Sequence, residues 1–190
     1  MIRASPALHT NWRFSLSSRE WVDPNARDTL PSRTATGTLI LALGNPLRGD
    51  DGIGVAVLEA LAGEKRLPHD LILQDGGAMG LEMLLTMQSY RRVIIVDAGN
   101  IGRAPGEWAR LRPDDLIPKT PDVKRRATTH DDGLAEALML GATLGILPPE
   151  IIIYAVQPLE MGWLPGLSQP AQKAIPAVCA AILETVYHQH

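Results

Sequence analysis

Short apolar runs alternate along the chain with segments whose hydrophobic residues recur at helical spacing. Runs of strand length lie at residues 38–43, 70–74, 92–96 and 150–156, and the alternating stretch at 107–113 is expected to be an edge strand. Helical spacing is found at residues 50–64, 80–88, 130–145 and 171–189. Strands that are almost wholly apolar are typical of a parallel sheet covered on both sides. The pattern predicts an α/β fold with a mainly parallel, twisted sheet of about five strands and helices on both faces.

The beginning of the chain shows neither pattern. Residues 1–36 are rich in Ser, Thr, Arg, Pro and Asn, and we expect them to be a disordered or loosely attached extension without a part in the chemistry. A transit peptide would lack the acidic Glu20, Asp23 and Asp28. Residues 37–190 are predicted to form a single α/β domain, in which the proline-broken, basic stretch 115–129 is expected to be a mobile surface loop.

Composition narrows the class of protein. The 190 residues carry a formal net charge of -3, which gives no electrostatic footprint for nucleic acid. No apolar run reaches the roughly 18 residues of a membrane span. One cysteine, Cys179, excludes an intrachain disulfide, and its apolar helical surroundings indicate a core residue rather than a nucleophile. We therefore expect a soluble cytoplasmic protein that binds neither nucleic acid nor membrane.

The turn GNPLRGDDGIG (residues 44–54) follows the first strand and opens the first helix. Gly44 and Gly49 have the spacing of the first two glycines of a phosphate-binding loop, but Asp50 and Asp51 stand where that loop needs Lys and then Ser or Thr. Two acids at the lip repel phosphate, so the turn suits a cation better. A nucleotide-binding module is the alternative, although the Gly-x-Gly-x-x-Gly pattern is also missing.

Four polar residues are brought to one edge of the predicted sheet. Asp51 lies in the turn after the first strand, Asp75 and Asp97 end the next two, and His130 opens a later helix. Ligands of such sheets bind beyond the carboxyl ends of the strands. Carboxylates this close repel unless a positive charge lies among them. A divalent cation such as zinc, nickel, manganese or iron fits this donor set.

Each of these residues also has a structural interpretation. Asp50 and His130 could cap helices, Asp75 before two glycines could stabilise a turn, and Asp97 could close a strand. Because neighbouring residues on a helix point about 100° apart, only one of Asp50 and Asp51 is expected to face a metal. The combination carries more weight than any single residue.

Several segments together resemble a known family. LALGNPLRGDDGIGVAVLEAL, LQDGGAMGLEML, RVIIVDAG and THDDGLAEAL are similar, in order and spacing, to the maturation endopeptidases of nickel-iron hydrogenases, and VQPLEMGWLPGLS resembles that family's loop before the last helix. The likeness runs from about residue 39 to the C-terminus and leaves the first 36 or so residues outside it.

The resemblance implies an α/β protease domain over residues 37–190. It implies an endopeptidase that removes a short C-terminal extension from the hydrogenase large-subunit precursor after nickel insertion, with that precursor as its partner. The family's metal-site residues match Asp51, Asp97 and His130, and Asp50 is a further candidate for support or for general-base work. Nickel is expected to arrive with the substrate, with another divalent cation such as zinc as the alternative.

Two mechanisms stay open at this point. In the first, the metal polarises the scissile carbonyl or activates the attacking water. In the second, the three residues bind nickel that the precursor already carries, and a carboxylate activates the water. We favour the second, because a check for loaded nickel explains a protease that acts on one partner. A chaperone that binds the loaded precursor without cutting it is a further alternative, and we expect a monomer.

Overall fold

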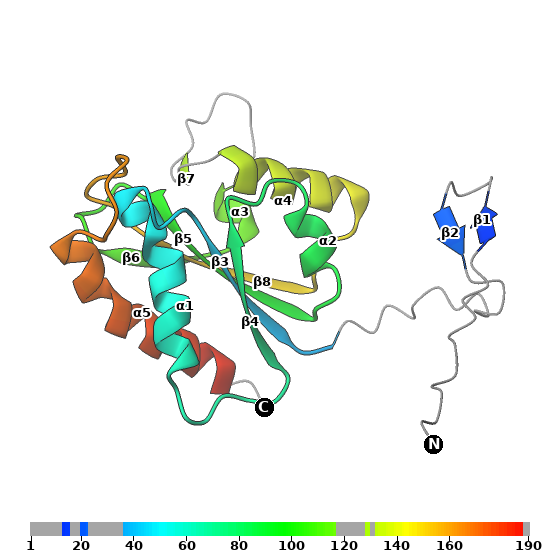
Figure 1. Ribbon diagram of the computed structural model, residues 1–190, viewed down its shortest axis with the longest axis horizontal. Coiled ribbons are helices and arrows are strands. Elements are labelled where there is room, and N and C mark those ends of the chain that lie inside the picture. Colours follow the sequence, from blue (N-terminus) through cyan, green and yellow to red (C-terminus); the bar gives the residue numbers. More distant parts are fainter. Residues whose placement is uncertain (1–12, 16–19, 23–35, 117–127, 130–131, 188–190) are drawn as a thin grey trace, which may run out of the picture. The chain divides into compact units, whose positions relative to one another are not determined.

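Figure 1 shows the computed structural model, which describes residues 13–15, 20–22, 36–116, 128–129 and 132–187. The chain divides into two compact units, Met1–Thr34 and Ala35–His190. In the first unit, β1 (Arg13–Ser15) pairs antiparallel with β2 (Glu20–Val22), a short pairing that the sequence analysis did not anticipate. That this extension takes no part in the chemistry stays a prediction.

The second unit is built around a sheet with the strand order β4-β3-β5-β8-β6. Its strands are β3 (Thr38–Leu43), β4 (Leu71–Gly77), β5 (Arg92–Asn100), β6 (Trp108–Leu111) and β8 (Glu150–Val156). All neighbours along this order pair in parallel except β6, which is antiparallel to β8 at the edge. A further strand of two residues, β7 (Thr128–Thr129), pairs with the end of β5. The prediction of a mainly parallel sheet with an edge strand at 107–113 is confirmed.

Helices cover both faces of this sheet (Figure 1). They are the 3-10 turn η1 (Gly49–Gly52) and the helices α1 (Ile53–Ala62), α2 (Met83–Met87), α3 (Pro113–Leu116), α4 (Asp132–Leu144) and α5 (Gln169–Tyr187). The predicted first helix therefore begins as a 3-10 turn that contains both Asp50 and Asp51. Residues 117–127 of the predicted surface loop lie outside the described residues.

Alternate side chains of the buried strands feed two hydrophobic cores. Ile40, Ile94 and Ile152 pack on the side of α1 and α5, whereas Leu41 and Ile95 pack on the side of α2 and α4. These strand residues are almost entirely inaccessible. Burial on both faces explains why the strands read as continuous apolar runs.

Two strands extend further than their apolar runs predict. Asp75 and Asp97 were expected to end their strands, but β4 continues to Gly77 and β5 continues to Asn100. For Asp97 the reason is pairing on a neighbouring strand, because it lies opposite Ala155 of β8. This expectation was wrong, and the correction places the Asp97 carboxylate inside a paired, rigid strand rather than on a turn.

The chain reverses its direction of travel across the sheet beside β3. From β3 it passes to β4 on one side and then crosses to β5 on the other. The crevice at such a switch point, beyond the carboxyl ends of the strands, is where α/β sheets bind ligands. The fold thus singles out the space between the ends of β3 and β5.

Candidate active site

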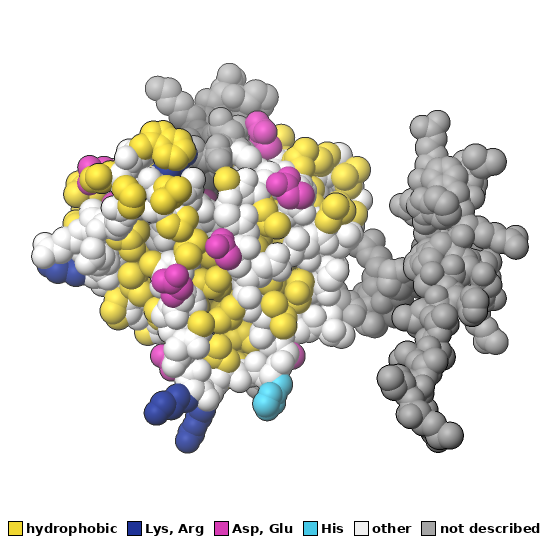
Figure 2. Space-filling model, in the orientation of Figure 1, with side chains coloured by type: hydrophobic (Ala, Val, Ile, Leu, Met, Phe, Trp, Pro, Cys, Tyr) yellow, Lys and Arg dark blue, Asp and Glu magenta, His cyan; other side chains and the backbone are white. Residues whose placement is uncertain are grey.

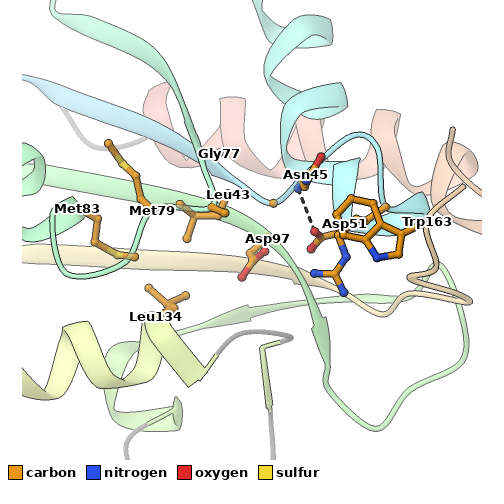
Figure 3. Close-up of a pocket in the computed structure, with 12 residues that line it drawn as sticks. Leu43, Asn45, Asp51, Gly77, Met79, Met83, Asp97, Leu134 and Trp163 are labelled. Carbon is orange, nitrogen blue, oxygen red and sulfur yellow. Dashed lines mark hydrogen bonds between the residues drawn. The ribbon is translucent and has the colours of Figure 1, made fainter. Parts of the chain in front are cut away.

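A cavity of about 140 Å³ lies at this switch point (Figure 3). Its walls come from the turn after β3, the end of β4 and the segment that follows it, β5, α2, α4 and the loop after β8. The lining residues are Leu43, Gly44, Asn45, Arg48, Asp51, Gly77, Ala78, Met79, Met83, Asp97, Leu134 and Trp163. The predicted acids Asp51 and Asp97 are therefore brought together on one cavity.

Asp51 is held by the glycine-rich turn that precedes it. The side chain is only 7% exposed, and its Oδ2 accepts a hydrogen bond of 3.0 Å from the backbone N–H of Asn45. Gly44 makes this arrangement possible, since its φ is +108° and a Cβ there would lie 1.9 Å from the carbonyl oxygen of Asp51. The turn thus closes tightly around the aspartate and presents its carboxylate to the cavity.

Asp97 reaches the same cavity from β5. It is also 7% exposed, and Figure 3 shows its carboxylate and that of Asp51 on the same cavity although they come from different elements. Two carboxylates on one small cavity favour a cation between them, because their negative charges repel each other. Their oxygens are suitable ligands for a divalent metal ion.

Asp50 faces away from this cavity and binds the loop between β8 and α5. We call residues 157–168 the lip loop. The buried Asp50 carboxylate accepts hydrogen bonds from the backbone N–H groups of Leu159 (2.8 Å), Glu160 (3.4 Å) and Ser168 (2.7 Å), and from the Ser168 hydroxyl (2.8 Å). It makes no side-chain cap to η1 or α1. Asp50 and Asp51 therefore point to different partners, and a catalytic role of Asp50 stays a prediction.

Asp75 stabilises an irregular stretch at the end of β4 rather than the turn that its structural interpretation predicts, because the strand pairing continues to Gly77 with a shift of register between the two residues. The side chain is exposed, and its Oδ1 accepts a hydrogen bond of 2.8 Å from the backbone N–H of Gly77. Asp75 is not among the residues that line the cavity, although Gly77 and Met79 are. Of the three acids predicted at this edge, two face the cavity and the third shapes its wall.

His130, the third predicted metal ligand, lies outside the described residues. Its described neighbours are Thr129, which pairs with Gly99 two residues beyond Asp97, and Asp132, where α4 begins. Among the residues that the structure does describe, no three or more His, Cys, Asp or Glu side chains gather closely enough to hold a metal ion. The complete ligand set therefore stays a prediction, of which the Asp51 and Asp97 part has a shared cavity.

Two lining residues were not singled out by sequence reasoning. Arg48 belongs to the glycine-rich turn, and its guanidinium carbon lies 5.5 Å from the ring centroid of Trp163 in the lip loop. Trp163 is 78% exposed. The available signal was a basic residue inside an acidic turn and a tryptophan in a Gly- and Pro-rich loop, but only the fold brings the two segments together.

The described part of the chain contains no helix long and apolar enough to cross a membrane. The family model described as hydrogenase maturation protease matches residues 55–185, a stretch that begins just after Asp51 and includes Asp97 and His130. Among curated proteins, a hydrogenase expression/formation protein HoxM of Azotobacter vinelandii is 34% identical over 152 residues, covering 80% of this chain and 72% of that protein. The hydrogenase 2 maturation protease of Escherichia coli is 32% identical, covering 77% of this chain and 91% of that protein.

Solved structures give the same result. The hydrogenase maturating endopeptidase HybD from Escherichia coli matches with a TM-score of 0.68 and 28% identity, covering 80% of this chain and 93% of that one. A [NiFe] hydrogenase maturation protease HycI from Thermococcus kodakarensis matches with a TM-score of 0.62 at 24% identity, a likeness of fold.

Proposed function

This chain belongs to the hydrogenase maturation protease family and is a processing endopeptidase, and on that premise we propose that it removes the C-terminal extension of a nickel-iron hydrogenase large-subunit precursor after nickel has been inserted. The observation that supports the proposal most is the shared cavity of Asp51 and Asp97 at the switch point of the sheet. Two carboxylates at the ligand-binding edge of the sheet supply oxygen ligands with which a protease can bind the nickel of its substrate.

In this proposal nickel is cargo that the precursor carries. Asp51, Asp97 and His130 bind it, two through carboxylate oxygen and one through imidazole nitrogen, a mixed donor set suited to nickel and to zinc. Three protein ligands leave coordination positions open for the precursor's own groups. An unloaded precursor then lacks the positive charge that joins it to two buried carboxylates, so it binds poorly.

The chemical step is peptide-bond hydrolysis. The oxygen of a water molecule attacks the scissile carbonyl carbon, a carboxylate oxygen that does not bind nickel accepts the proton that the water loses, and the C–N bond breaks as its nitrogen gains a proton. Nickel held by Asp51, Asp97 and His130 would supply positive charge beside the reacting carbonyl. Asp50 fits the support role better than the base role, since its oxygens accept hydrogen bonds from the lip loop.

The test compares one large-subunit precursor in nickel-loaded, zinc-loaded and metal-free forms, with products weighed by mass spectrometry. Loss of a single C-terminal peptide from the nickel-loaded form alone supports both proteolysis and nickel recognition. Cleavage of all three forms would disprove the requirement for nickel but support proteolysis. Cleavage of the nickel-loaded and zinc-loaded forms alone would show that a metal is required but that it need not be nickel.

The residue assignment is tested in the same assay. Replacing His130 by Ala is expected to abolish cleavage, whereas His69→Ala, at an exposed position, serves as the matched control. Full activity of His130→Ala would remove it from the ligand set.

The place of action and the oligomeric state are part of the proposal. A single cysteine is compatible with a reducing cytoplasm, where we place the enzyme. We expect a monomer that meets the precursor as its partner. Light scattering of the enzyme alone measures its oligomeric state, and light scattering with precursor measures the complex. A stable dimer of the enzyme alone would overturn the expectation of a monomer.

A further inference from the structure

We infer that Arg48 and Trp163 form a binding subsite for the precursor polypeptide, in which the Arg48 guanidinium donates to an oxygen of the bound chain and the indole contacts an apolar side chain beside it. The inference rests on the proposed function, because it takes the large-subunit precursor as the ligand. It adds recognition residues that lie beside the metal-binding acids.

Arg48 lies on the wall of the cavity, and its guanidinium carries hydrogen-bond donors that no described residue accepts. Its side chain forms no ion pair and no hydrogen bond with another described residue, although Asp51 and Asp97 line the same cavity. Its Nε is buried and has no hydrogen-bond partner. A buried unpaired donor costs about 1–3 kcal/mol, and in a native structure such a group requires an explanation. The terminal N–H groups of the guanidinium are not among these buried atoms, so a ligand that supplies an oxygen acceptor can reach them at the wall of the cavity.

Trp163 contacts the guanidinium of Arg48 but accepts no hydrogen bond from it. The distance of 5.5 Å from the guanidinium carbon to the ring centroid is within the range of a cation–π contact. This contact orients the planar fork of Arg48 but supplies no oxygen acceptor to its N–H groups. Because Trp163 is 78% exposed, its indole can turn toward a ligand without opening the core.

The surroundings of this pair suit a polypeptide. Leu47 of the glycine-rich turn and Leu159 and Leu164 of the lip loop are 58%, 57% and 63% exposed. Figure 2 shows hydrophobic side chains gathered over the lip loop, which is orange in Figure 1. Exposed apolar residues gathered beside a cavity are typical of a surface that binds another protein. Leu47 and Leu164 adjoin Arg48 and Trp163 in the chain, and these two residues line the cavity that holds Asp51 and Asp97.

The two segments that carry the subsite are joined firmly. The backbone N–H of Gly49 donates to the carbonyl of Leu164 (2.8 Å), and the N–H of Asp50 donates to the carbonyl of Glu160 (3.0 Å). The backbone segments that carry Arg48 and Trp163 are thus hydrogen-bonded to each other, which favours a preorganised binding site.

The charges around Arg48 limit its ligand to groups with an oxygen acceptor. The neighbouring Asp51 and Asp97 repel an approaching carboxylate, whereas the guanidinium attracts any carbonyl or carboxylate oxygen. The acceptor is therefore either a backbone carbonyl or an acidic side chain of the precursor. The rim around it accepts a segment with apolar side chains.

The experiment measures kcat and KM for nickel-loaded precursor with Arg48→Met, Arg48→Lys and Trp163→Ala. We expect Arg48→Met to raise KM about tenfold to hundredfold with kcat changed less than threefold, since one hydrogen bond to a charged group is lost. Arg48→Lys is expected to recover part of this loss, because it keeps the charge but not the fork. Trp163→Ala is expected to raise KM about tenfold through lost contact area.

The controls remove an exposed arginine and an exposed large apolar residue elsewhere. Arg91→Met lies at the amino end of β5 and Leu144→Ala at the end of α4, both exposed, and both should leave KM unchanged. A purely structural role of Arg48 would lower the melting temperature and kcat together, and that result would overturn the inference. So would a KM within threefold of the wild type in Arg48→Met.

Binding to immobilised precursor, measured in parallel, separates the two proposals. Cleavage by wild-type protein with an unchanged dissociation constant in Arg48→Met overturns the inference and leaves the proposed function. Binding without cleavage, weakened by Arg48→Met, overturns the function and supports the inference, whereas neither binding nor cleavage overturns both. A precursor whose C-terminal acidic residues are neutralised identifies the acceptor: the Arg48→Met effect persists if it is a backbone carbonyl and disappears if it is a carboxylate.

Discussion

The Asp50 carboxylate accepts two hydrogen bonds from Ser168, one from its backbone N–H at 2.7 Å and one from its hydroxyl at 2.8 Å. These residues are 118 positions apart in the chain. Their contact joins the turn that carries Asp51 to the end of the lip loop. The wall of the cavity formed by these two segments therefore depends on a residue that does not itself face the cavity.

Replacing Asp50 by Ala is expected to destabilise the protein and to slow cleavage. The change removes the acceptor of several part-buried hydrogen bonds from the lip loop, so the free energy of unfolding should fall by about 2–4 kcal/mol. Urea titration measures this loss. Asp115→Ala is the matched control, since Asp115 accepts one exposed hydrogen bond from Arg112 N–H and should cost under about 1 kcal/mol. Unchanged stability of Asp50→Ala would contradict the anchoring role.

Replacing Asp51 or Asp97 by Asn is expected to abolish cleavage without loss of stability. Asn is isosteric, and removing one of two buried negative charges on the same cavity relieves repulsion. Activity should drop at least about a hundredfold, while the melting temperature stays level or rises. Asp70→Asn, exposed at the start of the β4 region, controls for charge alone. Retained cleavage by Asp97→Asn would disprove the metal-site assignment.

Gly54→Ala is expected to be strongly destabilising. A Cβ at this position would lie 2.4 Å from the carbonyl oxygen of Leu43 and 2.7 Å from that of Val96, so α1 would have to move away from both β3 and β5. We expect a loss of about 2–4 kcal/mol in the free energy of unfolding, as for overpacked cores.

Gly80 provides the comparison for this substitution. A Cβ at Gly80 meets only the end of the Glu82 side chain, at 3.5 Å. Gly80→Ala should therefore stay within about 0.5 kcal/mol of the wild type. Equal losses for the two variants would show that contact with the strands is not the cause.

Cys179 is expected to react slowly with iodoacetamide and to be dispensable for cleavage. Burial raises the pKa of the Cys179 thiol above its ordinary value, and the negative charge of Glu64 raises it further. The reactive thiolate is therefore scarcer at pH 8 than in a free cysteine, and the alkylation rate should still be rising well above that pH. Mass spectrometry of timed samples measures the rate. Rapid labelling at pH 8, or loss of activity in Cys179→Ala, would contradict this interpretation.

Much of the fold follows from the spacing of apolar residues. The runs at 38–43 and 150–156 coincide with β3 and β8, because strands buried on both faces admit few polar residues. Strand ends were less predictable. Asp97 looks like the end of a strand in the sequence, but pairing of β5 with β8 and β7 extends it, and that pairing depends on residues far along the chain.

The candidate site was predictable as a set of acids but not as a cavity. Topology alone brings Asp51 and Asp97 to one edge, and the structure confirms that they line one cavity. Different orientations of Asp50 and Asp51 were expected from their adjacency, but the partner of Asp50 could not be derived, because it lies in the lip loop. The positions of Arg48 and Trp163 depend on the same long-range contact.

The anchors of the lip loop are largely main-chain groups. The N–H groups of Leu159 and Glu160 and the carbonyl of Leu164 are available from almost any amino acid at those positions. The side chains displayed between the anchors can therefore be exchanged while the loop keeps its path and the acids keep theirs. The corresponding loop of another enzyme of this family can therefore be grafted here with its attachments kept, and the proposed subsite predicts that the exchange changes which precursor is bound.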